Sequence, residues 1–158
     1  MASYASRLPS GLHLLRGEPT AAIAADQYGR LLAFLSIFYE VVLVDLGPGL
    51  TAPVARLALD RADQVVFVTT AESMTAHVVA AALDRLDQER TTVVVNRAAD
   101  GRIEGALRAR GFRQAFALPD DDRLHLMLES GTYSLGALPR DVRLPVKRLA
   151  ASVAARVV

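Results

Sequence analysis

The chain has 158 residues, of which 52% are hydrophobic and 22% are charged, which fits one globular domain and excludes an extensively disordered protein. The formal net charge of +1 argues against a general nucleic-acid-coating surface, and no apolar run reaches the length of a membrane span. The absence of cysteine removes disulfides, thiolate metal sites and cysteine nucleophiles, and it fits a cytoplasmic protein.

Short apolar runs along the chain predict β-strands. Their apolar residues follow one another instead of alternating, which is typical of strands buried on both faces of a parallel sheet. The four main runs cover residues 41–46, 65–69, 92–95 and 115–118, and residues 12–15 form a weaker candidate. Valine dominates three of the four main runs, which strengthens the strand prediction.

Segments with helical periodicity lie between these runs. Helices are predicted over residues 28–38, 52–61, 74–86, 103–110, 123–130 and 144–157. Gly111 suits a left-handed cap after the fourth helix, and Pro145 fits the last helix only in its first turn. The alternation predicts an α/β fold, a doubly wound and mainly parallel sheet with helices on both faces. We expect one domain over residues 1–158, with residues 1–10 disordered or vector-derived.

A carboxylate ends the first main run and precedes a glycine-rich turn. Asp45 can hold Mg²⁺ directly or through water, and it is the only metal ligand predicted here. Gly47 and Gly49, on either side of Pro48, would let the backbone approach a phosphate closely. An Asp that caps an ordinary loop fits the same residues equally well.

Polar residues also end the third and fourth runs. Asn96, followed by Arg97, carries an amide that can pair with the edge of a purine, although a strand-terminal Asn more often satisfies local backbone groups. Pro119 and Asp120 begin a loop whose backbone could flank a base, while Asp120 or Asp121 could cap the next helix. Ligands of open parallel sheets bind beyond the carboxyl ends of the strands, where these residues are expected.

The order of these strand ends resembles the ParA/MinD family, the deviant-Walker ATPases of the SIMIBI class that act in partitioning, division-site selection and protein positioning. The resemblance is strongest to actinobacterial members, and it covers the chain from about Gly11 onward. It rests on YEVVLVDLGPGL, ADQVVFVTTAESMTA, VVVNR and ALPDDDRLHLMLESGTYSL, in this order. It implies a P-loop NTPase-like fold and a parent protein that is an ATP- and Mg²⁺-dependent, dimeric positioning ATPase.

The resemblance also implies roles for the residues at the strand ends. Asp45 matches the Walker B carboxylate near Mg²⁺, and the turn from Gly47 to Gly49 matches switch II. Asn96 with Arg97 matches the position that reads adenine. The loop that contains Pro119 and Asp120 matches the one whose backbone lines adenine.

The P-loop of that family does not occur in this sequence. There is no GxxxxGK[ST] motif, and the single lysine, Lys147, lies in a predicted helix without a nearby glycine. We therefore expect that this chain alone does not hydrolyse ATP, and we predict no catalytic residue. ATP and Mg²⁺ are the cofactors expected of the parent protein, whereas this chain alone could bind neither. Two interpretations stay open: a fragment of a longer ATPase, which we favour, and a complete pseudo-ATPase that serves as a protein-interaction scaffold.

The absence of a P-loop strand indicates which partners the chain would bind. Loss of the P-loop strand would leave an open sheet edge, so the expected partner is a second copy of the chain or a complementary N-terminal segment. The sequence does not decide whether the protein contacts DNA or membrane. The last helix is basic and amphipathic and could lie on anionic lipid, but its many alanines and lack of aromatic anchors favour packing against the sheet.

Other enzyme classes fit the sequence less well. A Rossmann-type dinucleotide-binding domain would use Gly47, Gly49 and Ala52 as its glycine motif, but no acidic residue ends the next strand. A serine hydrolase would need a GxSxG elbow, which is absent. The histidines are far apart and lack metal-ligand spacing; they are His13, His77 and His125.

Overall fold

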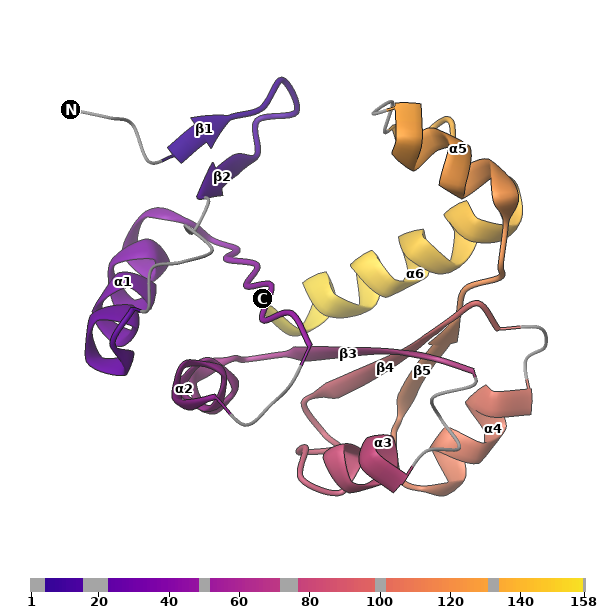
Figure 1. Cartoon of the computed structure of the whole chain (residues 1–158), viewed down its shortest axis with the longest axis horizontal. Coiled ribbons are helices and arrows are strands. Elements are labelled where there is room, and N and C mark those ends of the chain that lie inside the picture. Colours follow the sequence, from indigo (N-terminus) through magenta and orange to yellow (C-terminus); the bar gives the residue numbers. More distant parts are fainter. Residues whose placement is uncertain are drawn as a thin grey trace. The chain divides into compact units, whose positions relative to one another are not determined.

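A computed structural model describes residues 5–15, 23–48, 52–71, 77–98, 102–130 and 134–157 (Figure 1). The side chains of residues 77–78, 102–104, 125, 128 and 156–157 are not described. The chain comprises two compact units, Met1–Ala58 and Leu59–Val158. Among the described helices, none combines the length and the apolar character needed to cross a bilayer.

The first unit contains a small antiparallel sheet and helix α1. Strand β1 (Ala5–Arg7) pairs with β2 (His13–Leu15), and the turn between them includes Gly11 at a φ of 88°. The weak strand candidate at residues 12–15 is thus confirmed, whereas β1 lies within the segment that was expected to be disordered. His13 Nδ1 lies 2.6 Å from the Tyr39 hydroxyl, which ties β2 to the residue that follows α1.

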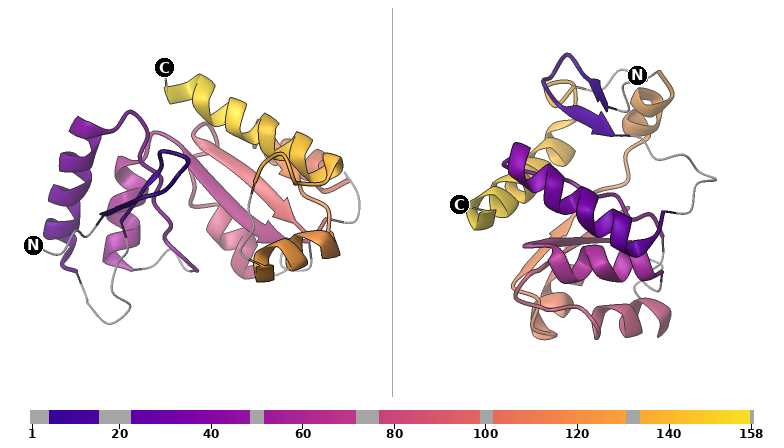
Figure 2. Two further views of the ribbon diagram at one scale, coloured as in Figure 1. Left: turned by 90° about the horizontal axis from the view of Figure 1, so that it is seen from above. Right: turned by 90° about the vertical axis from the view of Figure 1, so that its left-hand side faces the viewer.

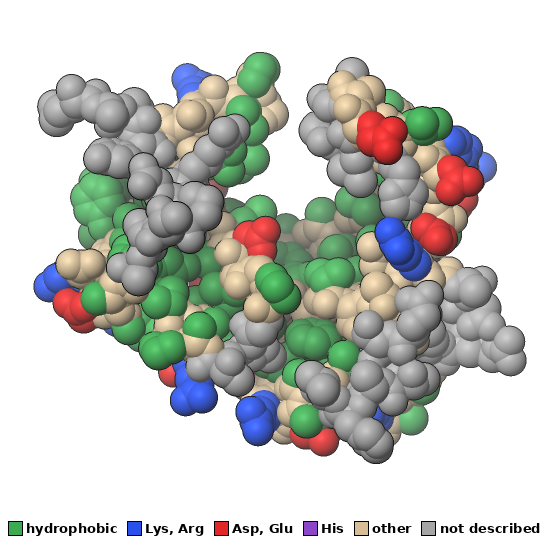
Figure 3. Space-filling model, viewed as in Figure 1, with side chains coloured by type: hydrophobic (Ala, Val, Ile, Leu, Met, Phe, Trp, Pro, Cys, Tyr) green, Lys and Arg blue, Asp and Glu red, His purple; other side chains and the backbone are tan. Residues whose placement is uncertain are grey.

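Helix α1 (Ala25–Phe38) starts three residues before its predicted position and ends where Tyr39 becomes extended. Its sequence is apolar on more than one side, and its last turns expose Phe34, Ile37 and Phe38. The rings of Phe34 and Phe38 contact each other with centroids 4.7 Å apart. Exposed apolar residues also occur outside α1, among them Leu43 and Val68. Figure 3 shows apolar side chains spread over the face in view.

The strand predicted at residues 41–46 is not formed, and this prediction was wrong. The segment has no regular secondary structure, and its first four side chains are exposed, with Leu43 exposed by 79%. A strand requires a neighbour that takes its backbone hydrogen bonds, and the apolar composition of a segment does not supply one. No described strand pairs with residues 41–46. Helix α2 (Pro53–Arg61) follows as predicted, with proline in its first position and Ala55 and Ala58 buried.

The second unit is built on a three-stranded parallel sheet. Strands β3 (Val65–Thr70), β4 (Thr91–Asn96) and β5 (Gln114–Ala117) lie in the order β3-β4-β5. The register pairs Thr70 with Asn96 and Val95 with Ala117, so the carboxyl ends of all three strands lie at the same end of the sheet. The three predicted strands and their parallel arrangement are confirmed, with boundaries that differ by one residue. The coarse prediction of an α/β fold is therefore correct.

Helices pack on both faces of this sheet (Figure 1). Helices α3 (His77–Leu83) and α4 (Arg102–Ala109) cover one face, where a buried cluster forms the core. The cluster consists of Leu83, Val93, Val95, Ala98, Leu107, Phe112 and Ala115. Side chains alternate between faces along a strand, so Gln114 points to the other face, where Ser152 of helix α6 (Arg140–Val157) donates a hydrogen bond to its Oε1. Figure 2 shows α6 along this second face from two further directions.

The end of α4 has the predicted glycine cap. Gly111 adopts a φ of 95°, and its N–H donates to the Arg108 carbonyl at 3.0 Å. The next N–H, of Phe112, donates to the Leu107 carbonyl at 3.2 Å. These two bonds are those of a Schellman motif, which satisfies the last carbonyls of the helix. The motif also brings Phe112 into the core beside Leu107.

Helix α5 (Asp122–Ser130) is found where it was predicted, but α6 starts four residues before its predicted position. The N–H groups of Val142 and Arg143 donate to the Pro139 carbonyl, which fixes the helix start at residue 140. Pro145 consequently lies in the second turn, although the sequence placed it in the first. A proline there removes one backbone hydrogen bond, which the long helix tolerates.

Candidate functional site

Two loops meet beyond the carboxyl ends of β4 and β5. The N–H of Leu118 donates to the carbonyl of Val95, and the N–H of Ala98 donates to the carbonyl of Leu118, both at 2.9 Å. The β5 loop is therefore bonded to β4 on one side of Asn96 and to the β4 loop on the other. This backbone pairing fixes the two loops against each other at the edge where parallel sheets bind ligands.

Asn96 and Arg97 form the corner of the β4 loop. Asn96 is half-buried, and its Oδ1 accepts a hydrogen bond from the Arg97 N–H at 3.1 Å, which is the local bond expected of a strand-terminal Asn. The side-chain NH₂ of Asn96 is not part of that bond. Arg97 adopts a φ of 56°, a left-handed conformation that costs a residue with a Cβ about 1–2 kcal/mol. Such conformations persist where surrounding contacts impose them, often at binding sites.

The β5 loop faces this corner. Arg97 Nε lies 3.9 Å from Asp120 Oδ1, so an exposed ion pair joins the two loops in addition to their backbone bonds. Pro119, between Leu118 and Asp120, is half-buried. The structure thus brings together four of the predicted site residues, namely Asn96, Arg97, Pro119 and Asp120.

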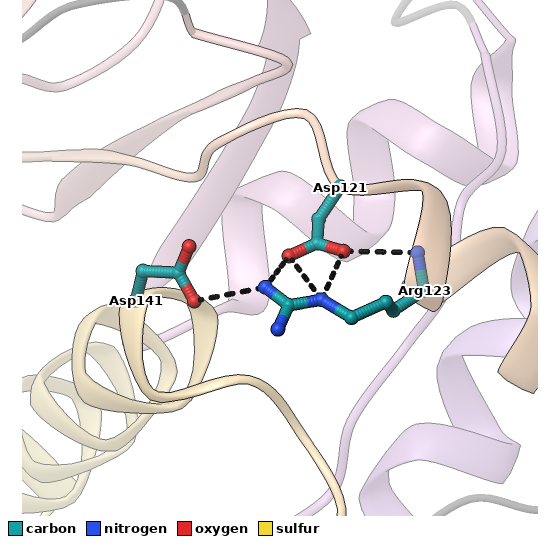
Figure 4. A network of polar contacts seen from close by, with 3 residues as sticks. All are labelled: Asp121, Arg123 and Asp141. Atoms are coloured by element: carbon teal, nitrogen blue, oxygen red, sulfur yellow. Dashed lines mark hydrogen bonds and ion pairs between the residues drawn. The ribbon is translucent and has the colours of Figure 1, made fainter.

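Capping of α5 is carried out by Asp121. Its Oδ1 accepts a hydrogen bond from the Arg123 N–H at 2.9 Å, and its carbonyl accepts one from Leu124. The Arg123 guanidinium also binds both carboxylate oxygens, and the Asp121 side chain is only 8% exposed (Figure 4). The side-chain hydrogen bond from Arg123 lowers the pKa of Asp121. The stability that this carboxylate contributes is therefore present above the ordinary pKa of Asp and is lost as pH falls through the lowered value.

The other predicted site residues lie in the first unit. The Gly47 N–H donates to Asp45 Oδ1 at 2.9 Å, and Gly47 has a φ of 61°, so Asp45 caps a tight turn here. Asp45 and Pro48 are exposed, and Gly49 lies outside the described residues. Within the described part of the chain, no group of three or more His, Cys, Asp or Glu side chains could hold a metal ion. Ligation of Mg²⁺ by Asp45 stays a prediction.

For two residues of this region, the sequence did not predict the contacts that they make. Arg123 was assigned only to the start of a helix, and Asp141 was assigned no role. Arg123 Nη2 lies 3.7 Å from Asp141 Oδ1 at the start of α6, in addition to its bonds with Asp121 (Figure 4). The Asp-x-Arg spacing at a helix start could have indicated the first contact. The second contact depends on how α6 packs, and the sequence alone gives no sign of it.

Comparison of the chain with protein-family models, with curated proteins and with solved structures finds no match. No family is assigned. The resemblance to ParA/MinD ATPases therefore rests on the sequence motifs.

Proposed function

We propose that the loops after β4 and β5 bind the base of an adenine nucleotide, in a protein of the ParA/MinD type. The observation that carries this proposal is the backbone bond between Ala98 and Leu118, which holds the Asn96–Arg97 corner against the Pro119–Asp120 loop. These are the two loops to which the family resemblance assigns adenine. They belong to one compact unit, so their relative position is part of its fold.

The side chains of the corner suit a purine. The amide of Asn96 offers a donor and an acceptor, which is the pattern that pairs with the N6 and N7 edge of adenine. The planar guanidinium of Arg97 can stack on a base, and its ion pair with Asp120 is half-exposed and can rearrange at low cost. The half-buried Pro119 gives an apolar surface beside these polar groups. An adenine ring needs both kinds of contact.

In the whole protein, binding and hydrolysis of ATP would drive the positioning or partitioning of a cargo. By the family resemblance, the phosphates and Mg²⁺ would be held by a P-loop, which this sequence lacks, together with Asp45, Gly47 and Gly49. This chain alone, without a P-loop lysine, binds the base side of the nucleotide and does not hydrolyse it. Affinity for the isolated chain is accordingly weaker than for a complete site, because the contacts to phosphate are missing.

Calorimetric titration of ATP and ADP, each with Mg²⁺, tests this proposal. We expect binding by the wild-type chain and an affinity roughly five- to 160-fold lower for Asn96→Ala, since loss of a two-point contact to a base costs about 1–3 kcal/mol. Gln88→Ala is the matched control, because it removes an exposed amide just before the amino end of β4. Equal affinity of Asn96→Ala and wild type, or no binding by the wild-type chain, contradicts the proposal.

We also propose that the chain associates with a second copy or a complementary segment along β3. This strand is an edge of the described sheet, and on the face that also bears Gln114 it exposes Val66 by 40% and Val68 by 60%. Exposed apolar sheet edges promote pairing with another strand. Sedimentation should give a mass that rises above 17.0 kDa with concentration. Val68→Glu should reverse this rise, and Leu126→Glu, a change on exposed α5, should not. A constant mass of one chain contradicts this part of the proposal.

A further inference from the structure

Arg123 makes more contacts than the capping of a helix requires. Its Nε donates to Asp121 Oδ1 at 2.8 Å and to Oδ2 at 3.1 Å, while Nη2 binds Oδ2. A guanidinium that engages both oxygens of one carboxylate fixes the orientation of both groups. The carboxylate is largely buried, so it has few other orientations available. Arg123 therefore determines where Asp121, and with it the end of the β5 loop, is held.

The same guanidinium reaches a second element. Nη2 of Arg123 lies 3.7 Å from Asp141 Oδ1 in the first turn of α6 (Figure 4). The backbone beyond Asp141 is already helical, since the Arg143 N–H donates to the Pro139 carbonyl at 2.7 Å. The far part of α6 is joined to the sheet through Ser152 and Gln114. One side chain thus connects the β5 loop with a helix that covers the second face of the sheet.

We infer that Arg123 is a positioning residue that couples the Pro119–Asp120 loop to the start of α6. The inference rests on the proposed function, because that loop is half of the proposed base site. A ligand on the loop stabilises the start of α6 through the Asp121–Arg123–Asp141 contacts. By linkage, a partner that displaces the start of α6 weakens ligand binding by the same factor. The start of α6 is thereby a regulatory element of the site.

Amide hydrogen exchange of the full chain at neutral pH, without ligand, tests the contacts themselves. The N–H of Leu124 reports on the loop, and that of Arg143 reports on the start of α6. Arg123→Gln should accelerate exchange of both roughly 1.4- to fivefold, which corresponds to the energies of about 0.2–1 kcal/mol measured for exposed ion pairs. The β4 amides should not change. Arg123→Lys keeps the charge without the planar fork and should restore part of the protection. Arg148→Gln, the same change at an exposed α6 arginine, should have no effect.

The coupling is tested with ADP as the probe. In the wild type, saturating ADP should slow exchange at both Leu124 and Arg143; in Arg123→Gln it should slow only Leu124. Unchanged exchange at both sites in ligand-free Arg123→Gln overturns the inference, and so does acceleration confined to Leu124. Failure of ADP to bind the wild type overturns the proposed function instead, because the ligand-free contacts are measured independently.

Discussion

Replacing Phe112 with alanine is expected to lower the free energy of unfolding of the second unit by about 3–5 kcal/mol. Phe112 is 1% exposed and packs in the core cluster with Leu107 and Ala115. Its position follows directly from the cap of α4, so the backbone cannot shift to close the cavity without losing the two cap bonds. Because a domain of this size has a total stability of about 5–15 kcal/mol, the loss is a large part of the whole.

Urea unfolding followed by far-ultraviolet circular dichroism measures this loss, and exchange of the β4 amides assigns it to the second unit. Leu126→Ala is the control, because that side chain is 64% exposed and its truncation should change stability by at most about 0.5 kcal/mol. A loss below about 1 kcal/mol for Phe112→Ala would contradict the core as described.

Replacing Gly111 with alanine should have the next largest effect on stability. Gly111 has a φ of 95°, which places the new Cβ in a strained conformation that costs about 1–2 kcal/mol. An added Cβ would also lie 2.3 Å from the Gln88 Oε1, so this side chain must move. Gln88 is exposed and flexible enough to move at small cost, so the backbone conformation dominates the loss.

Gly105→Ala, inside the helix that Gly111 caps, is the matched control for this change. Gly105 lies inside α4 at an exposed position, and an added Cβ would meet nothing within 4 Å. Alanine is a better helix former than glycine by about 0.5–1 kcal/mol, so this variant should be more stable than the wild type. The same substitution should therefore have opposite signs at two positions six residues apart. The same sign at both would contradict the Schellman cap.

The sheet of the second unit could be predicted because its strands are short continuous apolar runs with no helical period. The run at residues 41–46 has the same composition, yet it forms no strand. The difference lies in the neighbours: β4 has a bonded strand on each side, whereas no described strand pairs with residues 41–46. The apolar composition of a segment indicates that it would fit into a sheet, but the segment forms a strand only where a neighbouring strand is available to pair with it.

At the candidate site, too, some features could be predicted from the sequence and others depend on tertiary contacts. Asn96 and Pro119 could be placed at one edge because carboxyl ends of parallel strands meet there. The left-handed Arg97 could not be foreseen, since arginine has no preference for that conformation and the loop bonds around it impose it. The link from Arg123 to Asp141 joins residues that are eighteen positions apart and depends on the packing of α6. The turn at Asp45 is present, and the Asp45 side chain caps it as an Asp before a glycine-containing turn commonly does.

The central claim is that the two loops beyond β4 and β5 hold an adenine base. Its most direct test is a titration of the isotope-labelled chain with ADP, followed by the NMR shifts of its amides, with GDP as the comparison. With ADP we expect the largest shifts at the Asn96 side-chain amide and at the backbone amides of Arg97, Ala98 and Leu118. With GDP we expect smaller shifts of the same amides. Shifts confined to other parts of the chain, or equal shifts with both nucleotides, would contradict it.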